Sequence, residues 1–140
     1  MLADRQRVLG DNHPATMASL HNLAGAYDEA GDVRRAVALY EQALAGQERL
    51  LGADHPDTLT FRSSLAAAYQ HLGDVQRAIP LYEQVLADRQ RVLGDDHPDT
   101  LTSRNSIADY LREVGETRAA READDDALAR LRPSPGSAAS

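Results

Sequence analysis

The sequence predicts an all-α protein built from a tandem array of helix pairs. Three segments of the chain repeat at a spacing of 42 residues, and half of the positions are identical between residues 10–51 and 52–93. Within each copy, apolar residues recur at intervals of three and four, which is the spacing of one face of an α-helix. No segment of useful length alternates apolar and polar residues, so we expect no strand.

Composition excludes several classes of function. The chain has 140 residues, a net charge of −7 and no Cys, so it has no disulfide framework, thiolate nucleophile or Cys-based metal site. The acidic balance argues against nucleic-acid binding, which normally needs a basic face. No apolar run approaches the roughly 20 residues that cross a bilayer. We therefore expect a cytoplasmic protein without membrane contact, and the Arg-only, Ala-rich composition indicates a bacterial gene.

The repeat period sets the expected boundaries. Residues 2–11 are identical to residues 86–95, so the chain begins inside a repeat and is expected to be a fragment of a longer bacterial protein. The array is expected to occupy residues 1–131, comprising the end of a preceding helix at 2–9 and repeats at 10–51, 52–93 and 94–131. A disordered tail is expected at 132–140, because this segment has few bulky apolar residues.

The first helix of each repeat is expected to begin after a His-Pro pair, since Pro is well tolerated at the first helical position. The three histidines, His13, His55 and His97, recur beside acidic residues and raise the alternative of a metal site. Equivalent positions in stacked units lie on the order of 10 Å apart, whereas zinc ligands lie at ~2 Å from the metal. We therefore expect helix starts there, and no metal or cofactor.

The second helices are expected to begin after Gly-Asp pairs, with Asp32 and Asp74 as N-caps. Small residues recur at the middle of every expected helix, where they would let helices approach closely: Ala24, Ala36, Ala66, Ala78, Ala108 and Ala120. The third copy keeps Gly115 but has Asp124 where the other copies have Tyr. Its second helix, ending at residue 131, is thus expected to be a terminal capping helix with one exposed face.

These residues resemble the tetratricopeptide repeat in their order along each copy: Leu23, Ala24, Tyr27, Gly31, Asp32, Ala36, Tyr40 and Ala43. The 42-residue period and the Gly-x-x-His-Pro-x-Thr linker resemble the longer variety found in kinesin light chains and many bacterial multidomain proteins. The resemblance implies a right-handed superhelix of antiparallel helix pairs. It also implies a concave groove, lined by the first helices, that binds a peptide or a partner protein.

The resemblance implies a set of polar groove candidates on the first helices. In the family, an Asn that matches Asn22 often hydrogen-bonds the ligand backbone, because an amide offers both donor and acceptor. Acidic candidates outnumber the single Arg112, which favours a basic or neutral ligand. The candidates are His21, Asn22, Asp28, Glu29, Ser63, Ser64, Gln70, His71, Asn105, Ser106, Asp109, Arg112 and Glu113.

Two hypotheses follow for the function. The first is a protein–protein interaction module that holds a peptide or partner in the groove. The alternative is a structural array that stacks end to end through its exposed N-terminal face. No residues combine a nucleophile, a base and an oxyanion partner, so we expect no enzyme.

Overall fold

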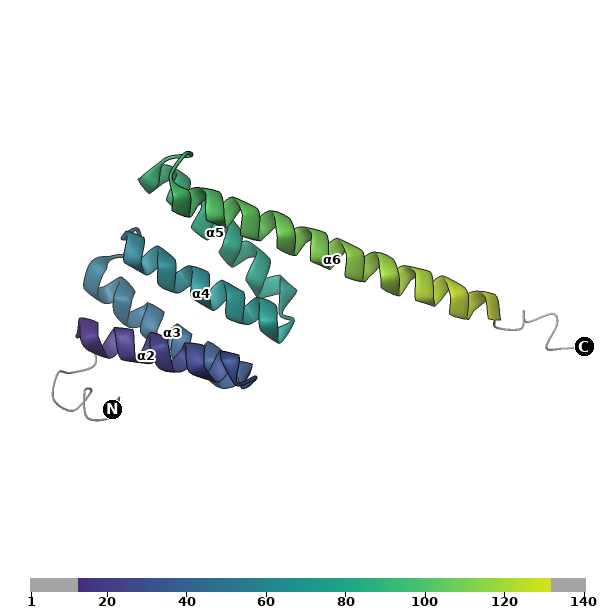
Figure 1. Cartoon of the computed structure of the whole chain (residues 1–140), viewed down its shortest axis with the longest axis horizontal. Coiled ribbons are helices and arrows are strands. Elements are labelled where there is room, and N and C mark those ends of the chain that lie inside the picture. The colour runs from purple at the N-terminus through teal and green to yellow at the C-terminus, as the bar shows by residue number, and fades with distance from the viewer. Residues whose placement is uncertain (1–12, 132–140) are drawn as a thin grey trace, which may run out of the picture. The chain divides into compact units, whose positions relative to one another are not determined.

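The computed structural model describes residues 13–131, and within this range it contains five α-helices and no strand (Figure 1). The helices are α2 (Pro14–Glu29), α3 (Val33–Leu51), α4 (Pro56–Leu72), α5 (Val75–Leu93) and α6 (Pro98–Leu131). The all-α prediction is therefore confirmed. The expected helix end at 2–9 and the expected tail at 132–140 lie outside the described residues.

The His-Pro pairs begin helices, as expected. The ring Nδ1 of His13 accepts a hydrogen bond from the backbone N–H of Ala15 at 3.1 Å. His55 does the same for Asp57, and His97 for Asp99, each at 3.1 Å. Each imidazole thus satisfies one of the backbone donors that a helix start leaves without a partner. This repeated role accounts for the recurring histidines.

The turn inside each of the first two helix pairs depends on a Gly-Asp dipeptide. Gly73 ends α4 in the left-handed conformation, with φ of 83°. The carboxylate of Asp74 then accepts a hydrogen bond from the backbone N–H of Arg77 at 3.2 Å, which caps α5. Asp32 caps α3 in the same way through Arg35. The chain therefore reverses direction within a few residues and places consecutive helices against each other.

Helices that follow each other in sequence pack together from α2 to α5 (Figure 1). The small residues expected at close helix contacts are fully buried in these four helices: Ala24, Ala36, Ala66 and Ala78. Met17, Leu20 and Ala43 form a core cluster between α2 and α3, with Leu39 and Phe61 packed against it. Burial of these apolar side chains stabilises the pairs, because each fully buried large side chain contributes about 1.5–3 kcal/mol.

The third copy differs from its prediction. We expected a turn at Gly115 and a separate capping helix, but α6 continues from Pro98 to Leu131 without a break. Gly115 has no positive φ, and Glu116 replaces the capping Asp of the earlier turns. Glu is a poor N-cap, so nothing stabilises a helix start at this point. Asp124 stands where Tyr40 and Tyr82 are buried, so the second half of α6 also lacks an apolar face.

α6 runs across the division of the chain into two contact units. By its contacts, the chain divides into two units between Ile107 and Ala108, so α6 begins in the first unit and ends in the second. Ala108 and Ala120, expected at close helix contacts, are exposed, so that prediction is wrong for the third copy.

Among the described residues, none of the helices is both long and apolar enough to cross a bilayer.

Candidate functional site

Side chains of the two first helices, α2 and α4, meet around His21. Its Nε2 lies 2.9 Å from Ser64 Oγ, and its ring stacks on Phe61 with the centroids 4.4 Å apart. Tyr40 meets the same ring edge-on, at 5.2 Å. Because the Ser64 hydroxyl donates to the carbonyl of Thr60 at 3.2 Å, its oxygen can accept from the imidazole. His21 therefore joins two repeats rather than standing free in solvent.

Burial lowers the pKa of His21 below its ordinary value. Removing an imidazolium from water is unfavourable, so the surroundings favour the neutral ring. A neutral ring carries one N–H donor and one acceptor nitrogen, which suits a single contact with the Ser64 hydroxyl. The contact between α2 and α4 at this point is thus compatible with a neutral ring.

A second pair joins the same helices further along. Nδ1 of His71 lies 2.9 Å and 3.0 Å from the two carboxylate oxygens of Asp28. The Asp28 side chain is 16% exposed and the His71 side chain 54% exposed. Burial raises the pKa of the nearby Tyr40 phenol, and the charges of Asp28 and Glu29 raise it further. This part of the surface is therefore acidic.

The other candidates on α2 and α4 surround these two pairs. Asn22 and Glu29 are exposed, whereas Ser63 is half-buried. Gln70 is also half-buried, and its Oε1 accepts a hydrogen bond from the Tyr82 hydroxyl at 2.7 Å. The surface thus presents an exposed amide and an exposed carboxylate beside groups that are already paired. Such groups can bind the backbone or the basic side chains of a peptide.

The third-copy candidates divide between the two units. Asn105 is exposed and Ser106 half-buried in the part of α6 that precedes Ala108. The other three lie in the second unit and are exposed: Asp109, Arg112 and Glu113. Arg112 Nη1 and Asp109 Oδ1 lie 3.5 Å apart, one turn from each other. An exposed pair of this kind contributes little to stability.

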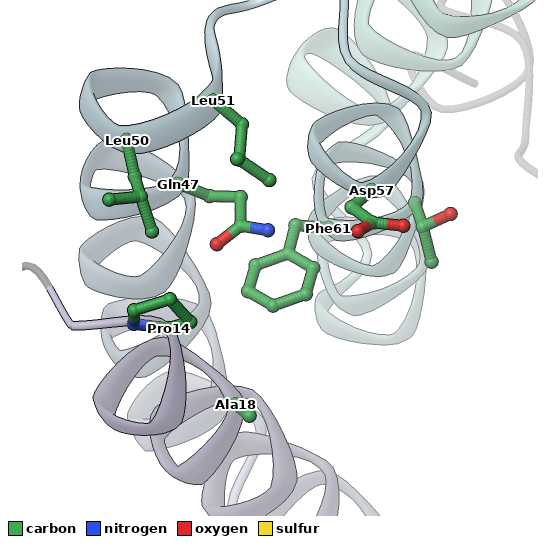
Figure 2. Close-up of a pocket in the computed structure, with 8 residues that line it drawn as sticks. Pro14, Ala18, Gln47, Leu50, Leu51, Asp57 and Phe61 are labelled. Atoms are coloured by element: carbon green, nitrogen blue, oxygen red, sulfur yellow. The ribbon is translucent and has the colours of Figure 1, made fainter.

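Sequence reasoning missed a cavity of about 420 Å³ at the junction of the first two repeats (Figure 2). We call it the junction cavity. The side chain of Gln47 points into it from α3, and the ring of Phe61 borders it on the α4 side. Gln47 is only 7% exposed. The complete lining consists of Pro14, Ala18, Gln47, Leu50, Leu51, Asp57, Thr60 and Phe61.

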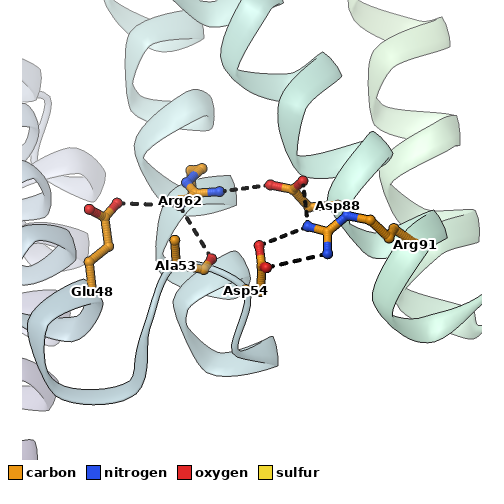
Figure 3. A network of polar contacts seen from close by, with 6 residues as sticks. All are labelled: Glu48, Ala53, Asp54, Arg62, Asp88 and Arg91. Atoms are coloured by element: carbon orange, nitrogen blue, oxygen red, sulfur yellow. Dashed lines mark hydrogen bonds and ion pairs between the residues drawn. The ribbon is translucent and has the colours of Figure 1, made fainter.

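Sequence reasoning also missed an ion-pair network around the buried side chain of Arg62 (Figure 3). The Arg62 side chain is 6% exposed, and it donates to Asp88 at 3.0 Å and to Glu48 at 3.3 Å. Arg91 binds Asp88 at 3.1 Å from the other side, and it also pairs with Asp54. The guanidinium of Arg62 thus connects α3, α4 and α5.

A signal for this network was present in the repeat alignment. Arg62 occupies the position that Leu20 holds in the first copy, and Asp88 the position of Gly46. Both replacements introduce a charge at a position that is buried in the preceding copy. Two opposite charges that enter equivalent buried positions together indicate an ion pair, because unpaired buried charges are very costly.

Among residues 13–131, no three His, Cys, Asp or Glu side chains cluster as metal ligands would. The described histidines instead serve as helix caps or as partners of Ser64 and Asp28. What this surface offers is hydrogen bonding, acidic charge and an adjacent cavity.

Comparison with known families decides the relationship. Models of the tetratricopeptide repeat match residues 16–57 and residues 57–132. The chain belongs to the tetratricopeptide repeat family. The resemblance read from the sequence is therefore confirmed, and so is the solenoid of antiparallel helix pairs. Tetratricopeptide repeats generally mediate protein–protein interaction.

Solved structures show the same relationship. One is a candidate kinesin light chain of Podosopora anserina with nearly identical tetratricopeptide-like repeats. Its sequence is 36% identical to this chain and its structure matches with a TM-score of 0.74. The match covers 95% of this chain and 64% of that one. Its Q17M variant is 37% identical with a TM-score of 0.72, covering 91% and 60%. The chain thus spans about three fifths of the length of these relatives.

A third structure supports the fold alone. BtubC (BKLC) from P. vanneervenii is 22% identical with a TM-score of 0.74, and the match covers 96% of this chain and 56% of that one. No curated protein sequence matches the chain.

Proposed function

We propose that this tetratricopeptide array binds an extended segment of a partner protein along α2 and α4. The observation that carries the proposal is the pair of contacts between these helices, His21 with Ser64 and Asp28 with His71. They hold the two first helices in register and leave Asn22 and Glu29 exposed beside them. A peptide backbone lying there would find both a donor and an acceptor in the Asn22 amide.

The charge of this surface supports a basic or neutral segment. Asp28 and Glu29 lie on α2, and their charge raises the pKa of the Tyr40 phenol on α3. An acidic partner would be repelled, whereas Arg or Lys side chains would form charge-assisted hydrogen bonds with Glu29. In this proposal, His21, Ser64 and His71 position the helices. Asn22 and Glu29 contact the partner, and no catalytic step is involved.

Peptide display against the full chain tests the proposal. We expect selected peptides to be extended and neutral or basic. Asn22→Ala should weaken their binding by about 10-fold, because the loss of one hydrogen bond from a desolvated backbone costs about 1–1.5 kcal/mol. Gln42→Ala serves as the matched control, since Gln42 is an exposed amide on α3. Equal affinities of wild type and Asn22→Ala would contradict the proposed groove.

Sedimentation of the same protein at several concentrations addresses the alternative. A monomer that binds selected peptides supports the interaction module. An oligomer that grows with concentration and selects no peptide would favour the structural array instead, with end-to-end stacking as its function.

A further inference from the structure

We propose that the junction cavity is a socket for an arginine side chain of the bound partner. This inference rests on the proposed function and adds a specificity to it. Ala18 and Thr60 are lining residues on α2 and α4, so the cavity adjoins the surface on which the partner would lie. The proposed socket would thus receive one side chain of a segment bound to these helices.

The first argument is the state of Gln47. Its side chain is more than nine-tenths buried and points into the cavity (Figure 2). It makes no hydrogen bond to any residue between 13 and 131. The amide is open to the cavity rather than sealed from solvent, so an occupant that covers it has to offer a hydrogen-bond partner in place of water. The Oε1 atom of this amide can accept from a guanidinium N–H.

The second argument is the chemistry of the remaining lining. The Asp57 carboxylate supplies a negative charge at the cavity, while Leu50 and Leu51 supply apolar surface. Phe61 adds an aromatic ring, which the stacked His21 holds in position. Arginine matches this combination, since its stem is apolar and its planar guanidinium stacks on aromatic rings and binds carboxylates. A purely apolar side chain would leave the Gln47 amide without a partner.

The third argument comes from the next junction of the same chain. Arg89 occupies the position in the second repeat that Gln47 holds in the first, and Ser103 corresponds to Phe61. The Arg89 side chain is buried there, and its Nη1 donates to Ser103 Oγ at 2.6 Å and to the carbonyl of Asp99 at 3.3 Å. The second junction therefore contains a guanidinium of its own. The first junction has the shorter Gln47 at this position, which leaves room for a guanidinium supplied by the partner.

Titration of the ¹⁵N-labelled full chain with N-acetyl-arginine methylamide tests the socket directly. N-acetyl-citrulline methylamide is the matched probe, since it has the same shape without the charge. We expect the side-chain amide signals of Gln47 to shift, with the arginine probe binding about 10-fold more tightly than the citrulline probe. Equal responses to both probes, or shifts that avoid Gln47 and Phe61, would overturn the socket.

Two sets of variants test which residues of the junction cavity bind the arginine probe. Asp57→Asn should weaken binding of the arginine probe, whereas Asp99→Asn, at the equivalent position of the next repeat, should leave it unchanged. The double variant Gln47→Arg/Phe61→Ser gives the first junction the residues of the second at these two positions, and we expect it to fold and to lose the probe. Unchanged probe binding in both Asp57→Asn and the double variant would refute the assignment.

The outcomes separate this inference from the proposed function. If displayed peptides bind along α2 and α4 but show no preference for arginine, the groove stands and the socket is wrong. If no peptide binds but the arginine probe still requires Gln47 and Asp57, the socket stands and the groove proposal fails.

Discussion

Met17 of α2 packs directly against the backbone of α3 at Gly46. A Cβ atom added to Gly46 would overlap the Met17 thioether and would lie only 2.9 Å from its Cε. Met17 is 2% exposed and belongs to the core cluster, so it has little room to move aside. Gly46 thus allows the close contact of the first helix pair, although Gly is a weak helix former.

Gly46→Ala is therefore expected to lower the free energy of unfolding by about 1–2 kcal/mol. In an open helix, this change would raise it by about 0.5–1 kcal/mol, but here the overpacking of Met17 outweighs that gain. Urea denaturation of both proteins measures the difference. In a Met17→Ala background the overlap is gone, so Gly46→Ala should become neutral or stabilising. A loss of the same size in both backgrounds would mean that Met17 is not the cause.

Removal of Arg62 should destabilise the protein strongly. Arg62→Leu leaves the Asp88 carboxylate, which is 18% exposed, with only Arg91 as a partner, so we expect a loss of about 2–3 kcal/mol. Arg62→Leu combined with Asp88→Ala should recover most of this loss, because the partly buried carboxylate that lost Arg62 is then removed as well. The first copy shows that such an apolar arrangement packs, since it has Leu20 and Gly46 at these positions. A double variant no more stable than Arg62→Leu would contradict this account.

The fold was predictable where its signals are local. Each His-Pro pair begins a helix through a contact two residues away, and each Gly-Asp pair reverses the chain within one turn. The turn predicted for the third copy is wrong because Gly115 is retained but the capping Asp after it is replaced by Glu116. The Glu side chain is one methylene longer than Asp and is a poor N-cap. Without a cap or an apolar face for a second helix, α6 continues through this position.

The candidate site was only partly predictable, because its contacts are distant in sequence. The alignment placed His21, Ser64, Asp28 and His71 on the first helices, but their pairing depends on how α2 and α4 pack. The junction cavity depends on the relative sizes of Gln47 and Phe61, which come from different helices. Periodicity indicates which face a residue occupies, and it does not indicate the volume left between two faces.

Acid should weaken the contact between the first two repeats through His21. Burial lowers the pKa of this imidazole in the folded protein, so the unfolded chain takes up the proton at a higher pH. The stability that neutral His21 contributes is therefore complete above its ordinary pKa of about 6.5 and declines as the pH falls below it. His21→Gln should show a shallower decline between pH 7 and pH 5 in urea denaturation. Parallel curves for the two proteins would show that His21 has no part in the acid sensitivity.

Gly115 and Gly73 should respond to alanine in opposite directions. Gly73 has φ of 83°, so Gly73→Ala strains the turn and should cost about 1 kcal/mol in urea denaturation. Gly115 lies within α6, with open space around the site of an added Cβ. Gly115→Ala should therefore strengthen the helix by about 0.5–1 kcal/mol, which slows local amide hydrogen exchange by roughly 2- to 5-fold. If the third copy instead turned at Gly115 like its predecessors, this substitution would speed exchange at residues 112–118, because the alanine would then occupy a strained left-handed position.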